Sequence, residues 1–287
     1  MVKAAACLLT VVLATGCSLL CNAPHHQGRT VASLTIESDA LSSNLVGLDP
    51  SRSVTVYLPA GYWETDAPYP TIYCLAYGHY YKNAQSYYVL LDSLYSHDEM
   101  SPAILVFIDS QTEHELSYYL NSAVFGNWED FVADEVVSAI DAAYRSIRSS
   151  SGRAILGSSV TGRSAFNLVV RRPNVWSTYA ANDPAFWLMW SYVDSRNPPA
   201  GESLSSIQAA VADLPDSLEG YGSASWTVKD LMQLATPYSP NPNHRRQADF
   251  PVDIDGNWIE EVHAKWEAHN PCQLGDTYET CAFSKET

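Results

Sequence analysis

The stretch Arg153-Ala154-Ile155-Leu156-Gly157-Ser158-Ser159-Val160-Thr161-Gly162 decides the fold prediction. Residues 153–156 are typical of a buried strand, and a helix is predicted to begin near Arg163. A serine between a strand and a helix can lie on a sharp turn, where its Oγ projects above the edge of a sheet. Backbone N–H groups at the start of the helix then face a developing oxyanion. The pattern therefore favours Ser159 as a nucleophile and the Val160 N–H as an oxyanion donor.

The same stretch departs from the usual turn motif at one position. Counted from Gly157 it reads G-x-S-x-T-G, so Thr161 stands where the motif has glycine, and glycine follows only at position 162. The motif has glycine there because strand and helix approach closely. A serine-rich loop after a strand is the alternative interpretation, but the predicted strand before it and the predicted helix after it favour the turn.

Apolar patterns on both sides of this stretch predict a sheet with helices between its strands. Alternating residues indicate antiparallel edge strands near the N-terminus, and short continuous apolar runs indicate strands buried on both faces of a parallel sheet. The predicted strands are 30–36, 53–59, 71–76, 104–108, 153–156 and 178–181, and the predicted helices are 84–95, 130–147 and one from about 163. This order predicts a doubly wound α/β sheet of about six strands with right-handed crossovers.

The composition changes after Asp183. Residues 184–256 are rich in proline, serine and glycine, and their helix-like pieces, 203–213 and 228–234, have no strand between them. A last amphipathic helix is predicted at 258–269. We interpret 30–287 as one α/β domain with a helical insertion or lid at about 184–256. Trp187 and Trp190 are candidates for a substrate groove in this insertion, with core packing as the alternative.

The charge of the chain excludes one class of partner. Acidic residues number 32 and basic residues 16, so the formal net charge is −16. Nucleic-acid affinity comes mainly from Lys and Arg, so nucleic acid is not expected as a partner. The cysteine spacing gives no metal signature, and residues 253–257 (DIDGN) lack the ligands of a complete calcium loop, so they predict a turn and a helix cap. We expect neither a metal nor a cofactor.

The first residues predict export. Lys3 precedes an apolar run over 4–14 that is too short to span a bilayer, which is typical of a signal peptide ending near Ala23. Residues 13–17 (LATGC) resemble a lipoprotein box in which cleavage after Gly16 would leave a lipidated Cys17. Both interpretations stay open, so we expect either a secreted protein or a cell-envelope lipoprotein anchored in the membrane through Cys17.

Several stretches together resemble the putative-esterase or esterase D-like group of α/β-hydrolases, which includes feruloyl and acetyl-xylan esterases and mycolyltransferases. They are 46–62 (VGLDPSRSVTVYLPAGY), 69–78 (YPTIYCLAYG), 118–131 (YYLNSAVFGNWEDF), 140–162 (IDAAYRSIRSSSGRAILGSSVTG) and 258–271 (WIEEVHAKWEAHNP). The resemblance implies an α/β-hydrolase fold for most of residues 30–271. It also implies that the loop after the strand at 71–76 supplies a second oxyanion N–H, from Tyr77 or Gly78.

The same resemblance implies an incomplete catalytic triad. In the family, two strands that follow the stretch like 258–271 carry the triad Asp and His, whereas only residues 272–287 follow here. We therefore expect the C-terminal strands to be missing. His263 is the candidate substitute base and Asp183 the candidate acid. Without a base a serine stays a neutral alcohol, and loss of a triad member lowers turnover by about 10⁴ to 10⁶-fold.

Three functional hypotheses remain. The first is an exported serine carboxylic-ester hydrolase that acts on feruloyl or acetyl esters of plant polysaccharides and is impaired by the missing triad residues. The second is a non-catalytic, truncated relative that binds carbohydrate or another ester-bearing ligand. The third is an acyltransferase, which needs only a second alcohol in place of water. The oligomeric state is left open, although missing strands would expose a sheet edge and favour a dimer contact or low stability.

Overall fold

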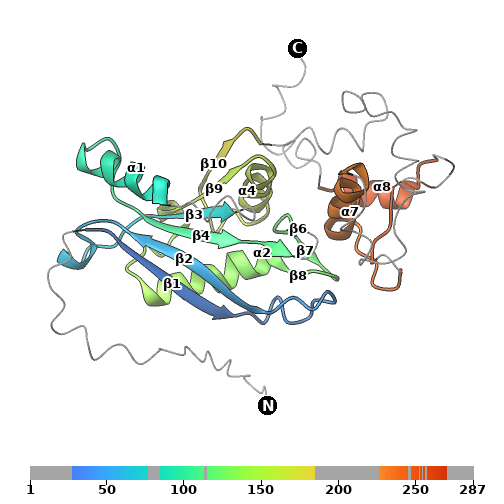
Figure 1. Cartoon of the computed structure of the whole chain (residues 1–287), viewed down its shortest axis with the longest axis horizontal. Helices are drawn as coiled ribbons and strands as arrows, with labels where there is room; N and C mark the ends of the chain where they lie inside the picture. Colours follow the sequence, from blue (N-terminus) through green and yellow to red (C-terminus); the bar gives the residue numbers. More distant parts are fainter. Residues whose placement is uncertain are drawn as a thin grey trace, which may run out of the picture.

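The computed structural model describes residues 28–76, 85–112, 115–184, 226–244, 247–251, 253, 255 and 257–269. Its centre is a six-stranded sheet in the order β1-β2-β4-β3-β9-β10 (Figure 1). The strands are β1 (Thr30–Glu37), β2 (Ser51–Leu58), β3 (Thr71–Ala76), β4 (Ile104–Asp109), β9 (Arg153–Ser158) and β10 (Thr178–Asn182). The pairs β3–β4, β3–β9 and β9–β10 are parallel, which confirms the predicted mostly parallel α/β sheet.

The two N-terminal strands are antiparallel as predicted, but only one of them is an edge strand. β1 pairs with β2, and β2 pairs in turn with β4, also antiparallel. The prediction of two edge strands was therefore wrong for β2, whose residues Val54 and Val56 are buried. The alternation of apolar and polar residues predicted that one face of β2 is exposed. Tyr57 on that face is instead fully buried against α1 (Gln85–Ser96).

Helices cover both faces of the sheet. One face packs on α1 through a cluster that includes Tyr57, Cys74, Tyr88 and Phe107. The other face packs on the helical segment 128–143 and on α4 (Val160–Arg171). Cys74 is buried, and burial raises the pKa of its thiol to about 12. Short elements between these layers are η2 (Tyr62–Glu64), β5 (Gln111–Thr112), β6 (Glu115–Leu116), β7 (Asn121–Ser122), β8 (Gly126–Asn127) and η5 (Ser150–Gly152).

The helix predicted at 130–147 is shorter and less regular than expected. It consists of α2 (Trp128–Asp130), the π-helical turn η4 (Phe131–Val136) and α3 (Val137–Ala143). Tyr144 leaves the helix with an extended backbone, and the Ile147 N–H then donates to the Tyr69 carbonyl at 2.9 Å. A long-range hydrogen bond therefore replaces the last predicted turn.

A second hydrophobic cluster lies beyond the ends of the strands, where α7 (Trp226–Tyr238) and α8 (Glu260–Glu267) run next to each other (Figure 1). We call it the α7–α8 cluster; its members are Leu116, Tyr118, Leu120, Leu231, Met232, Leu234, Ala235, Tyr238, Ala248, Phe250, Val262 and Trp266. Both helices overlap predicted ones, whereas the helix-like piece 203–213 lies outside the described residues. The division into a domain and an insertion at 184–256 stays a prediction.

Candidate active site

Ser159 occupies a sharp turn between β9 and α4. Its backbone has φ 54° and ψ −125°, and as a non-glycine residue with positive φ it is strained by about 1–3 kcal/mol. Its N–H donates to the Asn182 carbonyl of β10 at 2.9 Å, and its carbonyl accepts from the N–H of Gly162 at 3.0 Å. The residue is exposed. The turn therefore presents the Ser159 hydroxyl at the end of the sheet.

β9 and α4 approach each other closely at Gly157, two residues before the serine. A Cβ on Gly157 would lie 2.1 Å from the Thr161 carbonyl oxygen, so no other residue fits without a backbone shift. Thr161 replaces the expected glycine because its hydroxyl is used locally. Its Oγ1 donates to the Ser158 carbonyl at 2.9 Å and accepts from the Ser158 N–H at 3.0 Å. The threonine thus holds the turn closed.

Val160 is the first residue of α4. The first N–H groups of a helix have no partner inside that helix, so the Val160 N–H is oriented to bind an anion at the turn. Its half-buried side chain packs on the α7–α8 cluster. That cluster therefore touches the segment that carries the serine.

The other predicted site residues are not joined to Ser159 in the part of the chain that the structure describes. Tyr77, Gly78, Trp187 and Trp190 lie outside the described residues, as does Cys17. Asp183 follows β10, is exposed and has φ 46°. His263 lies on α8 with its ring edge-on to Trp258, at 4.9 Å between centroids. Among the described residues, no side chain hydrogen-bonds to Ser159 Oγ.

His269 packs against Tyr238, with 4.8 Å between the ring centroids. Arg171 Nη2 is 2.9 Å from His269 Nδ1, and Arg171 is the last residue of the 12-residue helix that Ser159 precedes. At 1.5 Å per residue the helix separates the backbones of Ser159 and Arg171 by about 18 Å. Burial lowers the pKa of His269 to about 3, helped by the charges of Arg171 and Arg163. The ring is therefore neutral at pH 7.

Sequence reasoning missed Arg163, one helical turn after the serine. Its side chain is fully buried between the rings of Tyr118 and Tyr238, with its Cζ 4.9 Å and 5.4 Å from the two ring centroids. Its Nη2 donates to Tyr238 Oη, whereas Nε and Nη1 have no hydrogen-bond partner among the described residues. The sequence feature that could have pointed to Arg163 is its positive charge in the stretch 160–170, which otherwise consists of apolar and small residues.

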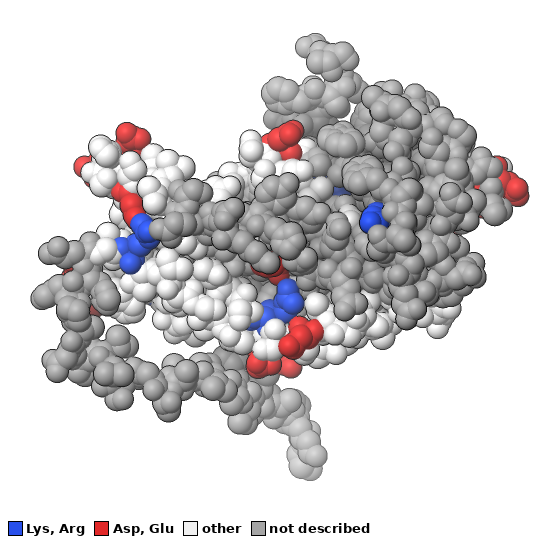
Figure 2. All heavy atoms as spheres, in the orientation of Figure 1, with Lys and Arg blue, Asp and Glu red and all other residues white. Residues whose placement is uncertain are grey.

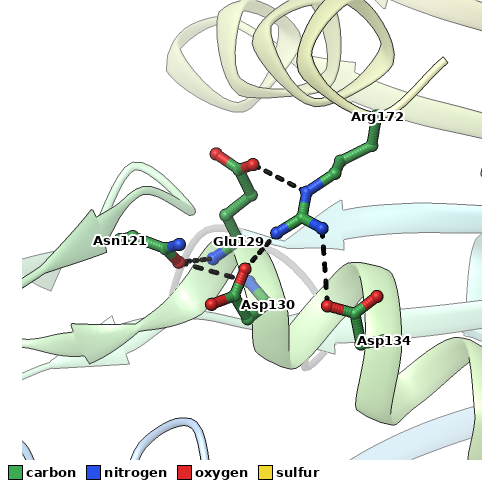
Figure 3. A network of polar contacts seen from close by, with 5 residues as sticks. All are labelled: Asn121, Glu129, Asp130, Asp134 and Arg172. Atoms are coloured by element: carbon green, nitrogen blue, oxygen red, sulfur yellow. Dashed lines mark hydrogen bonds and ion pairs between the residues drawn. The ribbon is translucent and has the colours of Figure 1, made fainter.

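A second arginine, Arg172, binds the start of the helical segment 128–143 (Figure 3). Its Nε donates to Glu129 Oε1 at 2.8 Å, Nη2 pairs with Asp130, and Nη1 lies 3.5 Å from Asp134 Oδ2. The hydrogen bond to Glu129 raises the pKa of Arg172, and the three negative charges add to it. This arrangement joins the end of α4 to the opposite helix on the same face of the sheet.

Neither the Asn127 nor the Asp130 side chain caps this helix. Asn127 makes no side-chain capping bond, and the Asp130 carboxylate pairs with Arg172. Asn121 is the capping residue: its Oδ1 accepts from the N–H of Glu129 at 3.0 Å and of Asp130 at 3.2 Å (Figure 3). The β7–β8 hairpin, which brings position 121 opposite 127, supplies this cap from outside the helix.

Comparison with known proteins decides the family. Residues 46–274 match the family model described as Putative esterase. The chain belongs to this esterase family. The match includes β9, Ser159 and α4, so the site described above is part of an esterase-family domain. No curated protein matches the chain.

Solved structures similar to this esterase-family chain include two ferulic acid esterases and an S-formylglutathione hydrolase. A ferulic acid esterase has a TM-score of 0.50 at 17% identity, with 86% of this chain and 98% of that chain covered. A ferulic acid esterase from the anaerobic fungus Anaeromyces mucronatus has a TM-score of 0.44 at 15% identity, covering 57% of this chain and 62% of that one. An S-formylglutathione hydrolase from Agrobacterium tumefaciens has a TM-score of 0.45 at 14% identity, covering 85% and 84%.

The described residues of this esterase-family chain contain no cluster of three or more His, Cys, Asp or Glu side chains arranged to hold a metal ion. Within them no helix has both the length and the apolar character that crossing a bilayer requires. On the face in Figure 2, the described charged side chains form small scattered groups and no extended basic area. Asp253 Oδ1 accepts from the N–H groups of Asp255 and Asn257, which forms a turn.

Proposed function

We propose that the chain is a serine carboxylic-ester hydrolase in which Ser159 is the nucleophile. The observation that carries this proposal is the strained, exposed backbone of Ser159 between β9 and α4, inside the matched esterase region. Strain of this kind persists only where the surrounding structure holds it, and it concentrates at functional sites. Gly157 and the Thr161 hydroxyl provide that hold.

In the proposed reaction Ser159 Oγ attacks the ester carbonyl carbon. The Val160 N–H and an N–H of Tyr77 or Gly78 then stabilise the negative charge on the carbonyl oxygen. The Ser159 proton passes to the leaving oxygen, so the alcohol departs and an acyl-serine remains, which water hydrolyses to the free acid and the serine hydroxyl. The same acyl-serine would react with a second alcohol in an acyltransferase. The ratio of the new ester to the free acid among the products separates the two activities.

The proton acceptor sets the expected rate. Because no described side chain hydrogen-bonds to Ser159 Oγ, the hydroxyl is not activated in this arrangement. His263 on α8 is the proposed substitute base and Asp183 the proposed acid. The lack of a hydrogen-bond partner for Ser159 Oγ among the described side chains also favours a second candidate function, a relative that binds an ester-bearing carbohydrate without turnover.

For the substrate we propose feruloyl or acetyl esters of plant polysaccharide. Similar solved structures described as ferulic acid esterases support this choice, together with the family match. We also propose export, on the basis of the signal-like residues 1–23. Mass spectrometry of the mature N-terminus tests it: a diacylated Cys17 or a start after Ala23 supports export, and a retained Met1 refutes it.

Turnover of p-nitrophenyl acetate and methyl ferulate by the full chain tests the activity. The matched variants are Ser159→Ala and Ser158→Ala, which remove neighbouring hydroxyls. We expect Ser159→Ala to abolish turnover and labelling by a fluorophosphonate probe, and Ser158→Ala to retain both within about threefold. Equal rates for the parent and Ser159→Ala would reject hydrolysis and leave the binding function, which retention on a feruloylated arabinoxylan column would then support.

A further inference from the structure

Arg163 is a buried cation in the first turn of α4, next to the proposed nucleophile. Its side chain is fully buried, and its backbone N–H donates to the Ser159 carbonyl oxygen at 3.3 Å. A guanidinium keeps its proton in proteins, so this position carries a permanent positive charge. At 1.5 Å per residue, the backbones of Arg163 and Ser159 are about 6 Å apart along the helix axis. A full charge therefore lies close to the turn that carries the serine.

No carboxylate neutralises this charge within the part of the chain that the structure describes. Arg163 Nη2 donates to the Tyr238 hydroxyl, and Nε and Nη1 have no hydrogen-bond partner there. The guanidinium instead lies between the rings of Tyr118 and Tyr238. Two rings keep water away from the charge without cancelling it. Its electric field is therefore screened less than that of a solvated or paired arginine.

A strained backbone supplies one of these two rings. Tyr118 and Tyr119 are consecutive non-glycine residues with φ of 52° and 55°. Strained residues persist only where the surrounding structure holds them, and they concentrate at functional sites. Here the Tyr119 N–H donates to Ser117 Oγ at 3.1 Å, and the Tyr118 ring packs on the Tyr238 ring with 5.8 Å between centroids. The fold thus maintains an unfavourable conformation where it covers the cation.

The position of Arg163 is also unfavourable for α4 itself. The N-terminus of a helix carries a partial positive charge, so cations stabilise the last turn of a helix and not the first. Arg171 and Arg172 lie at the C-terminal end and follow this rule, whereas Arg163 contradicts it. The charge of Arg163 adds to the partial charge at the helix N-terminus. Both favour negative charge at the Ser159 turn.

A neighbouring residue responds to the same charge. Arg163 hydrogen-bonds to Tyr238, and Arg171 hydrogen-bonds to His269. The pKa of His269 is nevertheless lowered by both charges, in addition to the larger effect of burial. Arg163 therefore acts through space on a group to which it is not bonded.

We propose that Arg163 accelerates the acylation of Ser159 by stabilising, through space, the negative charge that develops on the ester carbonyl oxygen. Arg163 sets the electrostatic potential at the turn and does not touch the substrate, so it is not itself a catalytic residue. Charges that are fixed before the reaction are effective because they need no reorganisation as the transition state forms. The inference rests on the proposed esterase function.

The test compares Arg163→Met with Arg171→Met in the full chain. Each change removes one cation from the same helix, but Arg171 is about 18 Å along the axis from Ser159. We expect Arg163→Met to slow fluorophosphonate labelling of Ser159 at pH 7 and to lower kcat for p-nitrophenyl acetate by about tenfold, with KM unchanged. Loss of a cation raises the pKa of neighbouring groups, so the midpoint of the labelling rate against pH should rise by about one pH unit. Arg171→Met should change each rate less than about twofold and leave the midpoint in place.

The variant Arg163→Lys separates charge from packing. Lysine keeps one positive charge but cannot reproduce the planar guanidinium between two rings. We expect it to label within about threefold of the parent, with the parent's pH midpoint. Labelling as slow as in Arg163→Met would refute the electrostatic role and leave a packing role. If circular dichroism shows that Arg163→Met does not fold, Arg163→Lys decides alone, and a tenfold loss of labelling refutes the proposal.

The same measurements separate the two ways to fail. If the parent labels no faster than Ser159→Ala, the proposed function itself is refuted. If the parent labels but Arg163→Met and Arg171→Met behave alike, only the role of Arg163 is refuted. Slower labelling of Arg163→Met with an unchanged pH midpoint also refutes it, because a change in packing alone explains that result.

Discussion

Two arginines of this chain sit at opposite ends of the same helix in opposite electrostatic surroundings. Arg172, just after α4, pairs with Glu129, Asp130 and Asp134, and its side chain is 28% exposed. Arg163, in the first turn, is fully buried between two tyrosine rings, and within the described residues its guanidinium contacts no carboxylate. The first arrangement joins two helices. The second places a cation with no carboxylate partner among the described residues one helical turn from the proposed nucleophile.

The difference shows which residues the fold itself requires. Burial of a charge costs several kcal/mol unless partners compensate for it, so Arg172 fits a structural role and Arg163 does not. A cost of this kind beside Ser159 is typical of a functional region, where local rules are broken and the rest of the fold compensates.

Replacing Arg172 should have the largest effect. Arg172→Met leaves the buried Glu129 carboxylate and two neighbouring carboxylates without their cation, so we expect a loss of about 3 kcal/mol in the free energy of unfolding. Urea denaturation measures it. Arg148→Met is the control, since Arg148 is exposed and donates only to the Asp141 carbonyl, and it should cost less than about 0.5 kcal/mol. Similar losses for both variants would contradict the structural role of Arg172.

The pH dependence of stability should be the second largest effect, and it arises at His269, whose pKa is lowered by burial and by the charges of Arg171 and Arg163. His269 has a pKa of about 3 when folded, well below its ordinary value of 6.5. The unfolded chain therefore binds the proton first as the pH falls. The contribution of His269 is complete above pH 6.5 and is lost progressively between pH 6.5 and pH 3, by roughly 2 kcal/mol at pH 5.

The variant His269→Gln isolates this contribution. Glutamine can still accept from Arg171 Nη2 but does not titrate, so the variant should lose less stability than the parent between pH 7 and pH 4. His97→Gln changes an exposed histidine and should keep the parent's pH dependence. Parallel curves for the parent and His269→Gln would show that the ring is not held neutral.

The sequence predicted the features that are set by neighbouring residues and did not predict those that depend on contacts between distant residues. The bounds of β3 and the turn at Ser159 follow from an apolar run and from a motif of a few residues, and both were predicted. The contacts of Arg172 join residues 38 to 43 positions apart, so no local pattern marks them. The π-helical turn at 131–136 and the early end of α3 depend equally on distant contacts.

The cap at Asn121 tests one of those non-local contacts with a smaller effect. Asn121→Ala removes the acceptor for two N–H groups at the start of α2, so we expect a loss of about 1 kcal/mol. Asn127→Ala replaces the residue directly before α2, and it should cost less than about 0.5 kcal/mol because its side chain makes no capping bond. A larger loss of stability for Asn127→Ala than for Asn121→Ala in thermal denaturation would contradict the cap at Asn121.

The smallest change in stability should follow from Arg163→Met, although this residue is the more deeply buried arginine. Removing the guanidinium gives up one hydrogen bond to Tyr238 and two cation–ring contacts, each worth about 1 kcal/mol, but it also removes a desolvation cost of several kcal/mol. These opposing contributions nearly cancel, so the free energy of unfolding should stay within about 1 kcal/mol of the parent or rise.

A titration of His269 in Arg163→Met checks the same electrostatic argument. Arg163 is one of the charges that lower the pKa of His269, so its removal should raise that pKa in an NMR titration of the ring. Arg172→Met should leave it unchanged, because Arg172 is not among the groups that shift it. A loss of stability in Arg163→Met as large as in Arg172→Met would mean that the buried guanidinium is compensated after all, and the contrast between the two ends of α4 would be wrong.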